Sequence, residues 1–175
     1  MLTLKNSAVV TIRHERISMK SINWKRLSIC IAIPLAVGFL SYLVTRRGME
    51  SFSELNMPPL SPPMWLFPVV WSILFILMGI ASYIVTVHGT DDREVKSALW
   101  IYGIQLLLNF LWTVIFFNFR MLTFAFIWLL ILFAFIIANT VSFGRIRRSA
   151  GYLLVPYLIW TAFAGYLNFM LSVLN

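Results

Sequence analysis

Neutral polar and aromatic side chains recur at helical spacing in three apolar parts of the chain. In residues 98–119 the set follows the spacing i, i+4, i+7, i+8 and i+11, and it consists of Gln105, Asn109, Trp112, Thr113 and Phe116. In residues 151–174 a similar set consists of Tyr157, Trp160, Thr161, Ala164 and Asn168. In residues 64–87 it consists of Trp71, Phe75, Met78 and Ser82. Residues at these intervals share one face of a helix.

These faces are predicted to point toward the interior of a membrane bundle, because lipid tails cannot satisfy an amide or a hydroxyl group. Two uses stay open. In the first, Asn109 bonds a neighbouring helix at roughly 0.6 to 2 kcal/mol and the rings only pack. In the second, the rings wall an apolar pocket for a flat hydrophobic ligand. Spacing alone favours the first use, but Trp71, Trp112 and Trp160 lie too deep in their stretches for an interfacial aromatic belt.

Acidic and basic residues are absent from the apolar stretches of this sequence. Ionisable groups inside the membrane are what proton-coupled pumps, voltage sensors and many transporters use, so acid–base catalysis and proton-driven transport have no candidate residue there. The two histidines, His14 and His88, lie at or beyond the ends of these stretches, away from the single cysteine, Cys30. We therefore predict no catalytic residue, no required cofactor and no metal site.

The composition places the chain in a lipid bilayer. Of its 175 residues, 61% are hydrophobic and 11% are charged, against about half and about a quarter in soluble domains. Each apolar stretch is long enough, or nearly so, to cross the hydrocarbon core of roughly 30 Å as a helix. We predict an all-α integral membrane protein, a bundle of five transmembrane helices in one domain (27–175), with helices at about 27–44, 64–87, 98–119, 121–143 and 151–174.

Basic residues predict the orientation, because cytoplasmic loops carry the excess of Lys and Arg. The basic amino-terminal segment 1–26 and the second and fourth loops carry eleven such residues, whereas the opposite side carries only Arg46, Arg47 and Arg120. We expect the amino terminus in the cytoplasm and the protein in a bacterial cell membrane. Attraction to anionic membrane lipids accounts for the net charge of +8, and nucleic acid is not an expected partner.

A stiff strap is predicted before the second helix, since residues 58–63 (PPLSPP) hold four prolines. Proline fixes its own φ and disfavours a helical conformation in the preceding residue. Proline is nevertheless tolerated in a first helical turn, so Pro62 or Pro63 is expected to open the helix with Ser61 as its cap.

Three segments of the chain resemble the tryptophan-rich sensory protein and translocator protein (TspO/MBR) family, whose vertebrate members were first known as peripheral-type benzodiazepine receptors. They are residues 62–75 (PPMWLFPVVWSILF) with MGIA at 78–81, residues 105–113 (QLLLNFLWT) with Phe116, Phe117 and Arg120, and residues 156–164 (PYLIWTAFA) with Leu167 and Asn168. With the five stretches, the resemblance covers roughly residues 27–175.

The resemblance implies a five-helix bundle, often a homodimer, with a pocket beneath the loop that joins helices one and two. In the family this pocket takes porphyrins, sterols in animal members, and synthetic aromatic ligands. Carried over by position, the ligand-binding residues are Phe52, Trp71, Phe75, Asn109, Trp112, Thr113, Trp160 and Ala164. The expected ligand is a porphyrin such as protoporphyrin IX or haem, or a similar flat hydrophobic molecule.

Two positions depart from the family pattern. Leu60 replaces the loop tryptophan before the double proline, and Phe75 replaces a tyrosine. Both weaken the case for light-driven porphyrin breakdown, in which loop indoles take part. The sterol-recognition pattern is missing as well, because no basic residue follows Arg148. Binding and sensing of porphyrin is therefore the leading hypothesis. Light-dependent degradation, facilitated transport of porphyrin and a scaffold for membrane partners are the alternatives.

Overall fold

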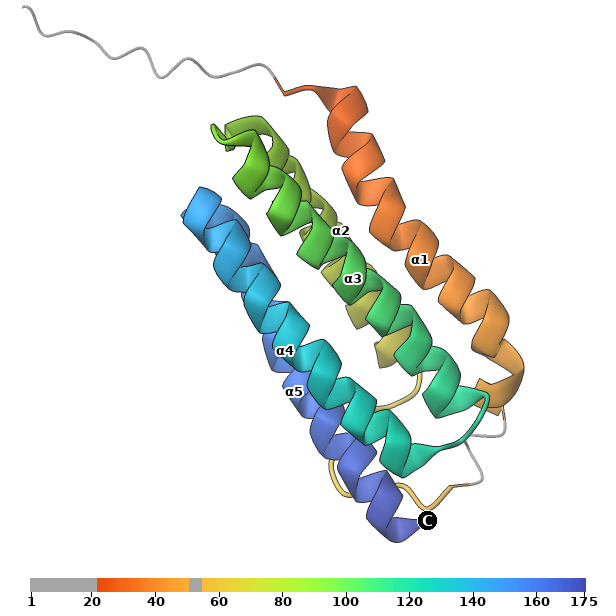
Figure 1. Cartoon of the computed structure of the whole chain (residues 1–175). Coiled ribbons are helices and arrows are strands. Elements are labelled where there is room, and N and C mark those ends of the chain that lie inside the picture. The colour runs from red at the N-terminus through yellow and green to blue at the C-terminus, as the bar shows by residue number, and fades with distance from the viewer. Residues whose placement is uncertain (1–21, 51–54) are drawn as a thin grey trace, which may run out of the picture.

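The computed structural model describes residues 22–50 and 55–175, and these residues form a bundle of five long helices with no strand (Figure 1). Each helix is long and apolar enough to cross a membrane. The helices are α1 (Trp24–Glu50), α2 (Leu66–His88), α3 (Asp92–Phe117), α4 (Leu122–Ile146) and α5 (Arg148–Leu174). The predicted fold class, an all-α five-helix membrane bundle, is confirmed.

Helices α1 and α3 extend beyond the apolar stretches that predicted them. Helix α1 continues past Val44 to Glu50, and α3 begins at Asp92 rather than near Ala98. The start of α3 is capped by Asp91, whose carboxylate accepts hydrogen bonds from the backbone N–H groups of Arg93 and Glu94. Hydropathy marks the hydrocarbon core, whereas backbone hydrogen bonding continues into the polar interface. Charged residues of the described helices therefore lie in their end turns.

The predicted opening of α2 was wrong. The helix begins at Leu66, and Ser61 donates its hydroxyl to the carbonyl of Pro58 at 2.8 Å instead of capping a helix. The helix is preceded by a separate turn in which the Leu66 N–H bonds the Pro63 carbonyl at 2.9 Å. Four closely spaced prolines keep the preceding residues out of the helical region, which delays the helix until the last of them has passed.

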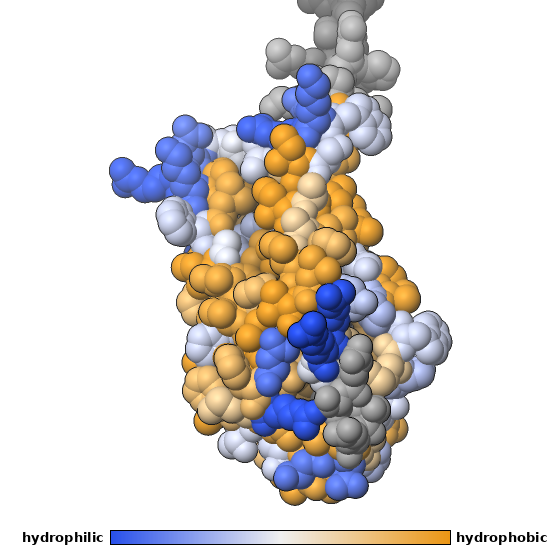
Figure 2. All heavy atoms as spheres, turned by 90° about the vertical axis from the view of Figure 1, so that its right-hand side faces the viewer, coloured by the Kyte–Doolittle hydropathy of each residue, from blue (hydrophilic) through white to orange (hydrophobic). Residues whose placement is uncertain are grey.

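The helices form a ring in the order α1, α2, α5, α4 and α3, and α3 packs against α1 to close it. Helices α2 and α3 follow each other in sequence but share few contacts, and α3 and α5 are not neighbours. The face of the bundle seen in Figure 2 has a broad apolar band between two groups of hydrophilic side chains, as expected for a surface in contact with lipid.

Small residues bring the helices close in the half of the bundle nearer the amino terminus. A Cβ added to Gly79 of α2 would lie 2.5 Å from the Cα of Ile31 on α1. A Cβ added to Gly151 of α5 would lie 2.9 Å from the Cα of Gly144 on α4. Glycines at such contacts let the backbones of two helices approach closely. In a membrane this packing matters because the hydrophobic effect does not drive helices together. On the same helices, Met78, Leu132 and Leu154 are fully buried.

Candidate functional site

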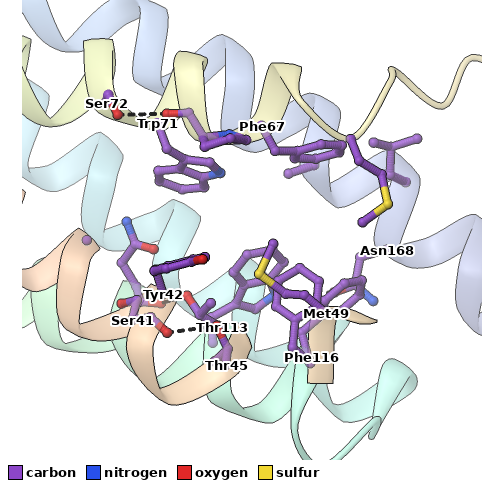
Figure 3. A pocket seen from close by; sticks show the side chains of 18 of the residues that line it. Ser41, Tyr42, Thr45, Met49, Phe67, Trp71, Ser72, Thr113, Phe116 and Asn168 are labelled. Carbon is purple, nitrogen blue, oxygen red and sulfur yellow. Dashed lines mark hydrogen bonds between the residues drawn. The ribbon is translucent and has the colours of Figure 1, made fainter. Parts of the chain in front are cut away.

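The other half of the bundle contains a cavity of about 610 Å³, at the end where α1 runs into the loop leading to α2. Its walls come from α1, α2, α3 and α5, and from Met57, Ser61 and Met64 of the connecting segment. Figure 3 shows Phe67 and Trp71 of α2 on one side and Tyr42 of α1 and Thr113 and Phe116 of α3 on the other. The cavity thus occupies the space that α2 and α3 leave between them.

Aromatic rings form much of the cavity wall. Trp71 and Phe75, one turn apart on α2, have ring centroids 5.6 Å apart. Trp112 and Phe116, one turn apart on α3, are stacked with centroids 5.1 Å apart and planes 20° apart. Because each pair lies on a single helix face, the rings hold one another in place. These walls offer faces for stacking to a flat apolar molecule.

A buried polar network lies directly beside the cavity. The Asn109 amide donates to the hydroxyl of Tyr157 at 3.0 Å, and this hydroxyl donates to Oε1 of Gln105, also at 3.0 Å. Gln105 and Asn109 are on α3 and Tyr157 is on α5, so the two bonds join helices that are not adjacent in the ring. Asn109 also lines the cavity. Asn109 therefore forms an interhelical hydrogen bond and also lies in the cavity wall.

A second bridge orients the Trp112 ring. Its indole N–H donates to Oδ1 of Asn168 on α5 at 3.3 Å, and the Asn168 amide donates to the carbonyl of Leu122 at 2.9 Å. Both residues line the cavity, so the bridge sets a ring plane in its wall. Trp112 and Asn168 are almost fully buried, where an unpaired N–H would be costly.

Comparison with known proteins decides the family. The sequence profile of the TspO/MBR family matches residues 30–174, which is most of the chain. This chain belongs to the TspO/MBR family. It is 39% identical over 150 residues to the tryptophan-rich protein TspO of Chlorobaculum tepidum, covering 85% of this chain and 95% of the relative.

More distant members of the TspO/MBR family match over a similar length. The tryptophan-rich protein TspO of Archaeoglobus fulgidus is 33% identical over 155 residues, covering 87% of this chain and 99% of the relative. The translocator protein of Bos taurus is 34% identical over 139 residues, covering 78% of this chain and 82% of the relative. The family therefore accounts for all five helices of this chain and not for a fragment of them.

Most of the ligand-binding residues predicted for this TspO/MBR protein line the cavity. They are Trp71, Phe75, Asn109, Trp112, Thr113 and Ala164. Phe52 lies outside the described residues. Trp160 is not among the lining residues, which corrects its predicted place in the wall. Its ring packs edge-on against Phe67 at 5.8 Å, so Phe67 of α2 contributes to the wall and Trp160 supports it.

The sequence reasoning missed the contribution of α1, which supplies seven of the lining residues. The set includes Gly38, Ser41, Tyr42, Thr45 and Met49. Ser41 and Thr45 are buried and bond to carbonyls one turn earlier in their own helix. A signal was present, because these residues follow the spacing i, i+3, i+4, i+7 and i+11, a stripe of small and polar residues in an apolar helix.

The described side chains of this TspO/MBR cavity present aromatic faces and neutral hydrogen-bonding groups. Among the described residues, its lining contains no Asp, Glu, His, Lys or Arg. Within residues 22–50 and 55–175 no group of His, Cys, Asp or Glu is arranged to hold a metal ion. The neutral polar side chains at the cavity surface include Ser41, Asn109 and Thr113.

Proposed function

We propose that this TspO/MBR protein binds porphyrins, or similar flat tetrapyrroles, in the cavity between α1, α2, α3 and α5. The observation that carries the proposal is the cavity itself: about 610 Å³, aromatic on two sides and bordered by neutral polar groups. This volume falls in the range of roughly 300–1,000 Å³ that small-molecule sites occupy. A planar macrocycle matches the stacking surfaces that Trp71 and Trp112 provide.

Stacking and burial supply most of the affinity in this proposal. Favourable aromatic pairs are worth about 0.5–1.5 kcal/mol each beyond the area they bury. The Asn109 amide group is already held by Tyr157 at 3.0 Å, so its orientation is set before a ligand enters. A polar group fixed in advance adds specificity without an ordering cost. The site therefore favours rigid aromatic molecules over flexible ones.

The proposal is tested by replacing one indole in the wall and one outside it. Trp71→Leu removes a stacking face from the cavity, whereas Trp100→Leu removes an indole that is 74% exposed on the outer surface of α3. Titration with protoporphyrin IX, followed by its Soret absorbance, is expected to show at least a tenfold weaker affinity for Trp71→Leu only. Equal affinities of both variants and the wild type would reject the cavity as the porphyrin site.

We further propose a bacterial cell membrane location with the amino terminus in the cytoplasm, which places the cavity near the outer face. The start of α1, the α2–α3 turn and the α4–α5 junction share the upper end in Figure 1, and the excess of basic residues lies there. In a Cys30→Ser background, the variant Ser149→Cys is expected to react with an impermeant maleimide only after cell lysis. Labelling in intact cells would reverse the orientation.

A further inference from the structure

A second hollow adjoins the cavity and contains two arginines. It measures about 530 Å³ and is lined by Tyr42, Arg46, Arg47, Met49 and Met64. Three of these residues, Tyr42, Met49 and Met64, also line the apolar cavity. The two spaces therefore border the same three side chains. The lining of the first is mainly apolar, and the lining of the second includes two arginines.

The arginines stand on an anchored part of α1. The amide of Asn118, at the end of α3, donates to the carbonyl of Val44 at 3.1 Å. Gly48 lies so close to the carbonyl of Phe117 that a Cβ there would collide with it. These contacts hold the last turns of α1 against α3, so Arg46 and Arg47 project from a fixed helix. Figure 2 shows hydrophilic side chains gathered toward the lower end of this face.

Neither Arg46 nor Arg47 has a carboxylate partner among the described residues. Both side chains are exposed. The nearest acidic residues in the sequence, Glu50 and Glu54, have side chains outside the described part. Consecutive helical residues point about 100° apart, yet both arginines border the hollow, so they flank it from two directions. Guanidinium groups bind carboxylate and phosphate oxygens in forked pairs.

We infer that the ligand class is an amphiphilic acid, with a flat apolar body in the cavity and a carboxylate or phosphate held by Arg46 and Arg47. This inference rests on the proposed function and narrows it. Among the described residues, the cavity lining contains no cation that would neutralise a charge within it, whereas the adjoining hollow contains two. The anion then fixes which edge of the ligand faces the membrane surface, and an uncharged analogue loses that orientation.

The test compares two forms of one probe in purified full-length protein in a neutral detergent. Protoporphyrin IX carries two carboxylates, and its dimethyl ester carries none. The wild type is expected to bind the acid about fivefold to tenfold more tightly than the ester, after each is corrected for micelle partitioning. The preference is expected to shrink between 0.1 M and 1 M salt, where the screening length falls from about 10 Å to about 3 Å.

The double variant Arg46→Gln/Arg47→Gln is expected to lose this preference and keep the affinity for the ester. The matched control is Arg147→Gln/Arg148→Gln, an adjacent exposed pair at the other end of the bundle, with the same change in charge. It is expected to bind both forms like the wild type. An unchanged preference in the Arg46/Arg47 variant overturns the inference and leaves the proposed porphyrin site standing. A wild type that binds neither form overturns both.

A lipid phosphate is the other source of the same anionic group, and nanodiscs separate the two. With phosphatidylcholine alone the preference for the acid is expected to persist, and phosphatidylglycerol is expected to reduce it by competition. If the preference is absent in detergent and in phosphatidylcholine, while phosphatidylglycerol is retained only when Arg46 and Arg47 are present, the arginines hold a lipid head group and the inference is wrong.

Discussion

Replacing Tyr157 by Phe tests whether the polar network holds the cavity half of the bundle together. The Tyr157 hydroxyl accepts from Asn109 and donates to Gln105, each at 3.0 Å, and it is the link between α3 and α5 at this level. The ring of Tyr157 packs against Trp71 with centroids 6.0 Å apart, and Phe preserves that contact. The substitution therefore removes two hydrogen bonds and little packing.

The expected loss of unfolding free energy depends on whether Asn109 and Gln105 find new hydrogen-bond partners once the hydroxyl is gone. A hydrogen bond between membrane helices averages about 0.6 kcal/mol and reaches about 1.7 kcal/mol, so two bonds give roughly 1–3 kcal/mol. Asn109 borders the cavity and is able to find water there. Gln105 is fully buried, and its remaining hydrogen-bond partner among the described residues is the Met78 sulfur, at the long distance of 3.7 Å. Gln105 does not border the cavity and cannot find water there. We therefore expect Tyr157→Phe to lower the unfolding free energy by about 2 kcal/mol.

The assay is reversible unfolding of the purified protein in mixed micelles with increasing dodecyl sulfate, followed by circular dichroism. Tyr152→Phe is the matched control, since Tyr152 is 71% exposed and should change the unfolding free energy by less than about 0.5 kcal/mol. Adding Gln105→Leu to Tyr157→Phe is expected to recover part of the loss, because both partners of one bond are then apolar.

A Tyr157→Phe protein as stable as the Tyr152→Phe control would refute this reasoning. It would mean that packing between neighbouring helices, and not the bridge across the bundle, sets the spacing of α3 and α5. A full loss with no recovery in the double variant would place the cost at Asn109 instead of Gln105.

Three further predictions concern a helix contact, the cavity and a buried amide. Gly79→Leu is expected to lower the unfolding free energy by about 3 kcal/mol because its side chain meets the α1 backbone, whereas Gly103→Leu, with open space around its Cβ, should have little effect. Ala164→Leu should weaken porphyrin binding about tenfold by filling the cavity, with no loss of stability in the same unfolding assay. Asn139→Leu should stabilise the protein by about 1 kcal/mol, because its buried amide has no hydrogen-bond partner among the described residues; lower stability would reveal one.

Much of the site was readable from sequence because its residues lie on single helices. The stripes Trp71 with Phe75 and Asn109 with Trp112 each follow one helix face, and helical periodicity places such residues together without knowledge of the fold. The wall from α1 was missed because its small and polar residues carry no tryptophan or amide to mark them. Trp160 was misplaced because helical spacing predicts which face a residue lies on. It does not predict that Phe67 of α2 lies between that face and the cavity.

The sequence by itself determined that five helices cross a membrane and which of their faces turn inward, since hydropathy and periodicity are local properties of a segment. Only the tertiary structure decided that α2 lies between α1 and α5, that the space beside α3 remains open, and that the end of α1 brings Arg46 and Arg47 to that space. Lipid is as apolar as the helices, so hydrophobicity does not choose neighbours. Close contacts at glycines such as Gly79, and hydrogen bonds such as those of Tyr157, make that choice through shape and polarity.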